Sequence, residues 1–410
     1  MKENVAFVVT GYGKEINGGT EQHCRMLAER LVSKYNVEVL TTCIKNYKSG
    51  QNEYFAGEEW LNGVLVRRFE GDPIDQELHD FYTKKSKKLT RLRKLLYRLR
   101  ILSLLSFVHW DIAKKIEEKV MKSYAFYSPK LIEYLQSNKD KYKAIITINI
   151  SYPLAYYTSV CVPEKTILIP TMHLESSSFR GILAEVFAKV AYIGYNTEAE
   201  QKLGERIFGS SMAKHGIISV GIDEAEDADW DATKLKYGLP NEYALFVGRI
   251  DPGKLNHIVD YFLTYKQKYT ESTLKLVLVG GLFTQKVNHS DILYTGFVSE
   301  GEKYAIIQHA KIFINPSKLE SLSLILLEGM SRGKALLVNG KCAVLKEHCK
   351  KSGGAAVHYV GKNQFISKLY FLDHSQDLRD RMGEKGKMYV SKNYNWKLIM
   401  DRLTNVIESI

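Results

Sequence analysis

Short runs rich in aliphatic and β-branched residues alternate with longer helix-like segments along almost the whole chain of 410 residues. This alternation predicts parallel strands joined by crossover helices, because a parallel strand needs a long return connection. The first series of predicted strands comprises residues 5–10, 37–42, 64–68, 144–148, 166–169, 191–194 and 217–220. The second series comprises residues 244–247, 274–279, 293–297, 312–315, 335–338 and 355–359. The predicted fold class is therefore α/β with two doubly wound parallel sheets.

The chain is long enough for two domains, each with its own hydrophobic core. Between the two strand series, residues 221–243 are acidic, poor in aliphatic side chains and interrupted by Gly238 and Pro240, as a linker with a surface helix would be. We predict an N-terminal domain of residues 1–219 and a C-terminal domain of residues 220–393. The last segment, 394–410, has a strong helical period and is free to dock on either domain.

Composition places the chain among soluble folded proteins, with 45% hydrophobic and 25% charged residues. The apolar run Val5 to Val9 is too short for the core of a signal peptide. The five cysteines are odd in number and lack CxxC spacing, which argues against a disulfide framework or a zinc site. We expect a cytoplasmic protein.

Most of the positive charge is local. The formal net charge is +12, and Lys84 to Arg100 holds nine Lys or Arg and no acid. Leu89, Leu92, Leu96 and Leu99 recur there at helical spacing, and an apolar patch, 101–108, follows. The segment 84–108 is too short in apolar residues to span a bilayer. It can be a solvated face, a nucleic-acid surface or a helix on anionic lipid; we favour lipid, because no RNA-binding motif is present.

The first loop carries Gly11, Gly13, Gly18 and Gly19 and leads into a helix predicted to begin near Glu21, with Thr20 as N-cap. Backbone amides at such a helix start can bind an anion. The spacing matches neither GxGxxG nor a phosphate-binding P-loop, so a plain turn is an equal alternative.

A second loop, after the predicted strand 244–247, carries Arg249 and Lys254. Both lie where an α/β sheet binds ligands, beyond the carboxyl end of a strand. Together they can neutralise a diphosphate, and the alternative is two solvated surface cations.

Two acids, Glu320 and Glu328, flank the next helix, predicted to begin at Ser321 to Ser323. Glu320 then lies on the loop and Glu328 in the helix, so they do not form a glycosidase pair across one bond. The amides of residues 321–324 can meet the anion that Arg249 and Lys254 approach. The alternative is a capping glutamate and a solvated one.

The ordered motifs resemble a retaining "group 1" glycosyltransferase of family four, with the GT-B fold of two Rossmann-like domains facing across a cleft. The resemblance covers nearly the whole chain, and E-x7-E with GR-x4-K upstream is its most specific part. The motifs are GGTE (18–21), HLE (173–175), YNTEAE (195–200), VGID (220–223), GRIDPGK (248–254), LVLVGG (276–281), TGFVSEGEKYAIIQHAKIFINPS (295–317) and ESLSLILLEGMSRGKALLV (320–338).

The resemblance implies a role for each matching residue. Arg249 and Lys254 match the pair that grips the donor diphosphate, Glu328 the acid on the ribose, and Glu320 the acid facing the transferred sugar. His173 matches the N-domain histidine near the reacting carbon, and the helix 394–410 matches one that crosses back onto the first domain. The implied donor-binding set is Gly18, Gly19, Arg249, Lys254, Val298, Glu320, Ser323, Leu324 and Glu328, and the implied catalytic set is Glu320, His173, Arg249 and Lys254.

Two positions depart from the family pattern. Ser323 stands where relatives usually have the glycine of E-G-F-G-L-P, and Lys334 stands in a turn that is commonly Gly-x-Pro. Ser323 puts the room for the donor sugar in question.

Two other signals compete with this interpretation. Asp227-Ala228-Asp229 matches the D-x-D metal motif of another glycosyltransferase architecture, but it lies in an acidic run that favours a solvated surface. His23 is interpreted as a helix-surface histidine, and the remaining histidines lack metal spacing.

The sequence therefore predicts a metal-independent hexosyltransferase without a cofactor. Its predicted partners are a nucleotide-diphosphate sugar and a glycan or lipid-linked acceptor, with an anionic membrane at 84–108 and no nucleic acid. We expect it in the cytoplasm, peripheral to the inner face of the membrane. The alternatives are an epimerase or hydrolase of sugar nucleotides and a non-catalytic glycan- or partner-binding subunit.

Overall fold

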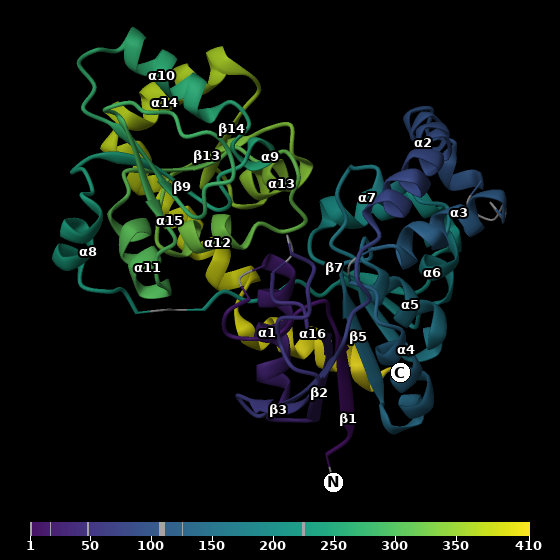
Figure 1. Ribbon diagram of the computed structural model, residues 1–410. Helices are drawn as coiled ribbons and strands as arrows, with labels where there is room; N and C mark the ends of the chain where they lie inside the picture. The colour runs from purple at the N-terminus through teal and green to yellow at the C-terminus, as the bar shows by residue number, and fades with distance from the viewer. Residues whose placement is uncertain (1, 17, 47–48, 106–110, 125, 224–225) are drawn as a thin grey trace. The chain divides into compact units, whose positions relative to one another are not determined.

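A computed structural model describes residues 2–16, 18–46, 49–105, 111–124, 126–223 and 226–410. It separates into two compact units, Met1–Val220 with Ile399–Ile410, and Gly221–Leu398 (Figure 1). The predicted patch residues 106–108 lie outside the described residues. Among the described helices, none combines the length and apolarity needed to cross a membrane.

The N-terminal unit is built on an eight-stranded sheet in the order β3-β4-β2-β1-β5-β6-β7-β8. All neighbours are parallel except β3 and β4. The strands are β1 Asn4–Val8, β2 Asn36–Thr42, β3 Gly57–Leu61, β4 Val64–Phe69, β5 Ala144–Ile148, β6 Thr166–Ile169, β7 Tyr192–Tyr195 and β8 His215–Ile217. The helices are α1 Gly19–Leu31, α2 Gln76–Arg98, α3 Asp111–Lys122, α4 Pro129–Asn138, α5 Pro153–Cys161, α6 Leu183–Lys189 and α7 Glu198–Phe208.

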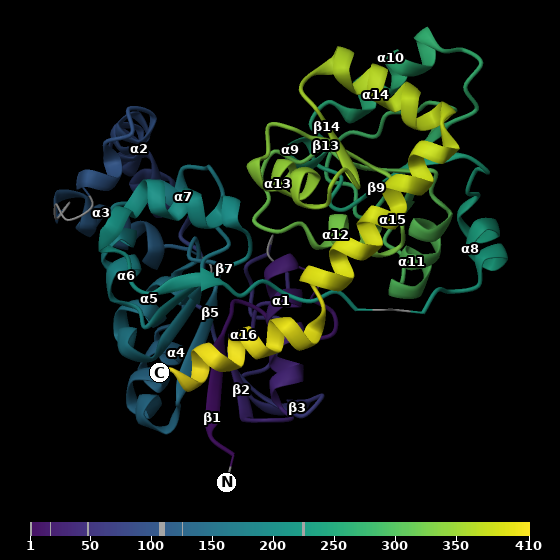
Figure 2. The same cartoon turned by 180° about the vertical axis from the view of Figure 1, so that it is seen from behind.

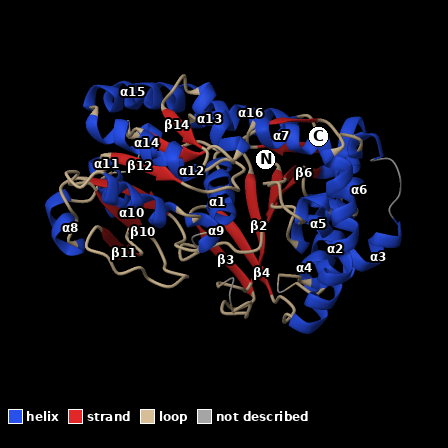
Figure 3. Cartoon of the chain, turned by 90° about the horizontal axis from the view of Figure 1, so that it is seen from above, coloured by secondary structure: helices blue, strands red, loops and turns tan. Residues whose placement is uncertain are grey.

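The C-terminal unit has a six-stranded parallel sheet in the order β11-β10-β9-β12-β13-β14. Its strands are β9 Tyr243–Val247, β10 Lys275–Val279, β11 Ile292–Gly296, β12 Ile312–Asn315, β13 Leu336–Asn339 and β14 Ala356–Tyr359. Its helices are α8 Trp230–Tyr237, α9 Pro252–Leu255, α10 Ile258–Lys268, α11 Glu300–His309, α12 Leu324–Ser331, α13 Ala343–Lys351, α14 Lys362–His374 and α15 Gln376–Asn393. In both units helices cover the sheet faces, so the central strands are buried aliphatic runs (Figure 3).

Each predicted strand is present, with ends shifted by a few residues, but one strand was missed. The missed strand is β3, which carries Glu58, Glu59 and an exposed Trp60. It forms a hairpin with β4 through Asn62 and Gly63, whose φ angles of 50° and 81° fit a tight turn of left-handed residues. The prediction failed because an edge strand with one solvated face lacks an aliphatic run.

The last helix, α16 (Trp396–Glu408), starts within the residues of the second unit, and from Ile399 on it belongs to the first (Figure 2). Ile399, Leu403 and Ile407 are fully buried. At its end Glu408 pairs with Lys34 at 3.3 Å and Lys143 at 3.0 Å. An apolar stripe and a terminal ion pair therefore hold this helix to the N-terminal unit.

Candidate functional site

Glycines line the carboxyl ends of β9, β10 and β11 in the C-terminal unit. The Gly248 N–H donates to Val279 O and the Gly280 N–H to Gly296 O, both at 2.9 Å. Gly280 has φ +131°, and a Cβ there would lie 2.1 Å from Gly248 O. Only glycine fits such a close approach of two backbones. The loop that carries Arg249 and Lys254 leaves the sheet at this edge.

The structure gives each of the two predicted cations an acidic partner. Lys254 Nζ lies 2.7 Å from Glu320 Oε1, which brings the loop after β9 to the loop before α12. Arg249 Nε lies 2.8 Å from Asp251 Oδ2, and the arginine side chain is 66% exposed. Asp251 also caps α9 by accepting the Lys254 N–H at 2.9 Å. Lys254 is therefore placed beside the start of α12, whereas Arg249 remains largely in solvent.

The helix after Glu320 begins at Leu324, so the predicted start at Ser321 to Ser323 was slightly early. Ser323 is the N-cap and has the left-handed angles φ 72° and ψ 72°. Its Oγ accepts a hydrogen bond of 2.8 Å from Asn315 Nδ2. A left-handed position explains why a glycine is usual there, and the bond to Asn315 offsets part of the strain of a serine.

Asparagines at the strand ends shape the loop that carries Glu320, and sequence reasoning missed them. Asn315 Oδ1 accepts the Ser317 N–H at 3.0 Å, and Asn339 Nδ2 donates to Pro316 O at 2.9 Å. Nε2 of buried His348 lies 2.8 Å from Leu322 O. Burial lowers the pKa of His348, so the ring is neutral and its Nε2–H can donate this hydrogen bond. Asn as the last residue of β12 and β13 was the available signal.

Glu328 is buried in α12, as predicted for an acid within the helix. Lys303 Nζ of α11 lies 3.0 Å from Glu328 Oε2, a partner that the sequence did not suggest. That oxygen has no hydrogen-bond partner, so the two groups attract as charges without an aligned bond. Val298 lies half-buried between β11 and α11, and Leu324 is half-buried at the first position of α12.

In the N-terminal unit, His173 lies on the loop after β6. Its Nδ1 is 3.7 Å from Glu175 Oε1, and the His173 carbonyl accepts from the Glu175 N–H and Ser178 Oγ at 2.8 and 2.7 Å. The proximity of the His173 ring is the largest cause that lowers the pKa of Glu175. The loop thus holds the histidine against an ionised acid.

Glu200 of α7 accepts hydrogen bonds that hold the start of the loop carrying His173. Its carboxylate accepts the Met172 N–H at 2.6 Å and the Asn196 N–H at 2.7 Å. Burial raises the pKa of Glu200 to about 8, against the effect of these two bonds. The Glu200 side chain therefore links Asn196, after β7, to Met172, the residue immediately before His173 in the loop after β6.

The glycine loop leads into α1, which begins at Gly19 with Gly18 as N-cap, so the prediction of Thr20 as N-cap was wrong. Gly18 has extended backbone angles and Gly19 is the first helical residue, so Thr20 lies inside the first turn of α1. A Cβ at Gly19 would meet nothing within 4 Å, so open space lies beside this amide. His23 is buried, not on the surface as predicted, and burial lowers its pKa to about 4.

The D-x-D residues have structural roles. Asp227 Oδ1 lies 2.7 Å from Arg332 Nη1, and Asp229 caps α8 by accepting the Ala232 N–H at 2.8 Å. Within the described residues, no group of three or more His, Cys, Asp or Glu could hold a metal ion.

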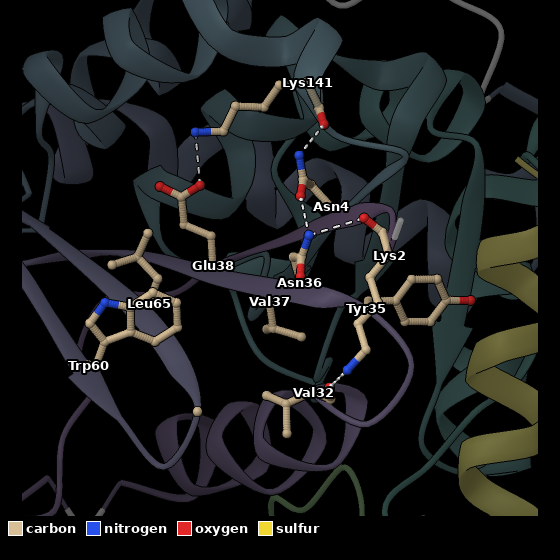
Figure 4. A pocket seen from close by; sticks show the side chains of 11 residues that line it. Lys2, Asn4, Val32, Tyr35, Asn36, Val37, Glu38, Trp60, Leu65 and Lys141 are labelled. Carbon is tan, nitrogen blue, oxygen red and sulfur yellow. Dashed lines mark hydrogen bonds and ion pairs between the residues drawn. The ribbon is translucent and has the colours of Figure 1, made fainter.

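A hollow of about 480 Å³ lies away from these residues, at the amino ends of β1, β2 and β4 (Figure 4). Its polar side chains bond with one another: Asn36 Nδ2 donates to Asn4 Oδ1 at 3.1 Å, and Lys141 pairs with Glu38 at 3.0 Å. The opposite, carboxyl edge of this sheet carries Gly18 and His173, where open α/β sheets bind ligands.

Comparison with known proteins agrees with the geometry of the C-terminal unit. Residues 231–389 match the family "Glycosyl transferases group 1". This segment is a group 1 glycosyltransferase domain. The domain contains Arg249, Lys254, Glu320 and Glu328. A serotype-specific mannosyltransferase, WbdA from Escherichia coli, is 26% identical over 237 residues, which cover 50% of this chain and 28% of WbdA. The chain thus matches less than a third of the length of that curated relative.

Solved structures extend the likeness to the whole chain. Sucrose-phosphate synthase from Thermosynechococcus elongatus has a TM-score of 0.68 at 14% identity and covers 100% of this chain and 99% of its own. A trehalose-6-phosphate structure from E. coli, bound with UDP-2-fluoro glucose, has a TM-score of 0.69 at 12% identity and 99% coverage of both chains. Anabaena HepE, in complex with UDP and glucose, has a TM-score of 0.67 at 11% identity and 100% coverage of both. The fold is GT-B, as the sequence predicted.

Proposed function

We propose that this protein transfers a hexose from a nucleotide-diphosphate sugar to a glycan or lipid-linked acceptor, with retention of configuration and without a metal. The observation that carries the proposal is the Lys254–Glu320 pair at the start of α12, beside the glycine-lined edge of the sheet. It puts an ammonium, a carboxylate and a helix N-terminus at one point, where a diphosphate and its sugar need opposite charges.

In the reaction, the bond between the anomeric carbon and the diphosphate oxygen breaks, and a bond to the acceptor oxygen forms on the same face. The acceptor proton passes to the leaving phosphate oxygen. Negative charge grows on the diphosphate, and Lys254, Arg249 and the α12 amides stabilise it, an effect commonly worth several kcal/mol. Lys254 then exchanges its bond to Glu320 for one to phosphate, which frees Glu320 for the positively charged sugar.

Two further roles complete the donor side. Oε2 of buried Glu328 is paired with Lys303 at 3.0 Å but accepts no hydrogen bond, so it is suited to accept one from a ribose hydroxyl. Val298, just before α11, and Leu324, the first residue of α12, are half-buried and suited to apolar contact with the nucleotide. Ser323 narrows the space that a glycine would leave for the sugar.

The N-terminal unit supplies the acceptor side. His173, 3.7 Å from Glu175, is the residue that the family resemblance assigns to the reacting carbon, and the open space at Gly19 suits binding of the acceptor or a phosphate by the amides of Gly18 and Gly19. The E. coli relative is named a serotype-specific mannosyltransferase, which favours a hexose as the transferred sugar. The basic segment after Lys84 favours work in the cytoplasm at the inner face of the membrane.

A melting-temperature panel tests the proposal. UDP-, GDP-, dTDP- and ADP-sugars are each added to the folded protein, since a ligand bound only by the native state raises its apparent stability. One class is expected to raise the melting temperature by several degrees, and the Lys254→Ala variant is expected to lose this shift. No shift with any sugar nucleotide contradicts the donor assignment.

Product analysis then separates the enzyme classes. Donor consumed without acceptor indicates the epimerase or hydrolase. Donor bound and never consumed, with any glycan acceptor, indicates the non-catalytic subunit. NMR of the product's anomeric centre tests retention, and unchanged activity in a chelator tests metal independence.

A further inference from the structure

The helix α2 buries three polar residues and leaves several of its apolar side chains in solvent, while Leu96 and Tyr97 pack against the core of the unit. Ser86, Thr90 and Arg93 are the buried positions, and Arg93 is only 1% exposed. By contrast Leu92, Leu95 and Leu99 are 44%, 51% and 59% exposed. Of the apolar stripe predicted at positions 89, 92, 96 and 99, Leu92 and Leu99 are exposed, whereas Leu89 and Leu96 are half-buried.

The exposed residues form one continuous face. Positions 78, 81, 85, 88, 92, 95 and 99 follow 3-4 spacing, which keeps them within about 100° of arc on a helix. Five of them are Leu or Phe and two are Lys: Leu78, Phe81, Lys85, Lys88, Leu92, Leu95 and Leu99. Leu104, just beyond the helix, is 67% exposed. Figures 1 and 2 show α2 at the outer edge of its unit, beside α3.

Cations surround this face. Of the nine between Lys84 and Arg100, Arg93 is buried and Lys94 bonds to the protein, and seven remain exposed. Acids on α2 are confined to its first two turns, Glu77 and Asp80. A helix with solvent-facing leucines among cations fits the boundary of an anionic bilayer, where leucines enter the acyl region and cations meet phosphates. A polynucleotide would match the cations and leave the leucines in water.

The inner side of α2 touches the loop that carries His173. Lys94 Nζ donates to Ser176 Oγ at 2.9 Å, and the Tyr97 ring meets the edge of Phe179 with centroids 5.2 Å apart. Ser178, between these two contacts, bonds the His173 carbonyl. The helix therefore has one face for solvent and one for the candidate catalytic loop.

We propose that α2 is an interfacial helix that docks on anionic lipid through its Leu92–Leu95–Leu99 face and thereby steadies the loop 173–180. Insertion fixes the helix, and Lys94 and Tyr97 pass that restraint to Ser176 and Phe179. Binding of α2 to lipid does not depend on the proposed function. Only the consequence of the loop restraint for catalysis rests on the proposed role of His173.

Sedimentation with vesicles tests the surface. The full chain is expected to bind vesicles of phosphatidylglycerol and phosphatidylcholine, and to ignore pure phosphatidylcholine. Leu95→Asn/Leu99→Asn is expected to bind about a hundredfold more weakly, since each inserted leucine contributes roughly a factor of ten. Leu235→Asn is the matched control, an exposed leucine (86%) on α8 of the other unit.

Equal binding of both vesicle types, or full binding by the double leucine variant, overturns the lipid surface. Binding to poly(U) RNA without binding to vesicles overturns it in favour of a nucleic-acid partner. None of these measurements needs a sugar nucleotide, so they stand apart from failure of the transferase assignment.

Amide hydrogen exchange tests the coupling. Anionic vesicles are expected to slow exchange of residues 173–180 several-fold in the wild type. Tyr97→Leu removes the ring that meets Phe179, and it is expected to bind vesicles without this protection. Tyr97→Phe keeps the ring and is expected to behave as wild type. Absence of protection in the wild type, or its persistence in Tyr97→Leu, overturns the coupling.

Discussion

At the scale of single residues, the pair of Lys254 and Glu320 determines how the site can work. In the proposed mechanism, the carboxylate that pairs with the lysine in the free protein is displaced from it when a diphosphate binds. The acid is then available for the sugar, where positive charge develops. One ion pair thus prepares both halves of the charge separation that the reaction needs.

The variant Glu320→Gln is expected to lower turnover by about 100-fold or more, the usual cost of removing one stabilising group at a reacting centre. Donor affinity should stay equal or rise, because Lys254 is released for phosphate. Steady-state kinetics with donor titration gives both quantities. Glu328→Gln is the control, expected to weaken donor binding with a smaller effect on turnover. Equal turnover in Glu320→Gln and wild type would remove this role.

Residue identities at the site came from spacing, but their partners did not. Arg249, Lys254, Glu320 and Glu328 stand in recognisable motifs. Lys303, which pairs with Glu328, lies within the motif 295–317, but that motif assigns it no partner. Sequence spacing reports neighbours along one element, whereas an ion pair between α11 and α12 depends on how two helices pack.

At the scale of elements, the start of α12 shows what a departure from a family pattern means. Ser323 adopts the left-handed conformation that a glycine takes without strain. Its bond to Asn315 keeps the amide at the end of β12 satisfied. The start of this helix was predicted one to three residues early. The positive φ angle of Ser323 could not be predicted, because it depends on the loop conformation that Asn315 and Asn339 stabilise.

We expect Ser323→Gly to be more stable than Ser323→Ala by about 1 kcal/mol, because both lose the bond to Asn315 and only glycine relieves the strain. Urea unfolding of the two variants gives the difference. Ser367, exposed in the middle of α14, is the matched position, and there alanine should be the more stable by about 0.5 kcal/mol or more. The same order at both positions would contradict the conformational argument.

Elements with an aliphatic run were predicted with the correct type, and those without one were not. β12 and β13 have four buried residues each and appear within a residue of their predicted ends. The edge strand β3 escaped prediction because it lacks an aliphatic run. The buried face of α2 escaped prediction because tertiary packing buries Arg93 and leaves Leu95 in solvent.

At the scale of the whole molecule, stability depends on buried groups that titrate. Burial lowers the pKa of His23 to about 4, below the unfolded value of about 6.5, so the folded state binds fewer protons. The stability of the folded protein that is linked to the lowered pKa of His23 is fully present above about pH 6.5 and is lost as the pH falls toward 4. Glu21 and Glu200, with pKa values raised to about 7 and 8, act in the opposite sense as the pH rises.

Glu21 and Glu200 are present in both wild type and His23→Asn. The difference in unfolding free energy between the two proteins therefore reports the titration of His23 alone. We expect His23→Asn to gain about 2 to 3 kcal/mol in unfolding free energy relative to wild type when the pH falls from 7.5 to 4.5. Urea unfolding at the two pH values gives this difference. A constant difference between them would show that His23 titrates normally in the folded state.

The central claim is that Lys254 and the start of α12 form one diphosphate site. Isothermal titration with the nucleoside diphosphate that stabilises the protein most tests it directly. We expect Lys254→Ala to weaken binding at least about tenfold, through the loss of one charge-assisted bond, and Lys268→Ala on α10 to leave binding unchanged. Equal affinity of Lys254→Ala and wild type would contradict the claim.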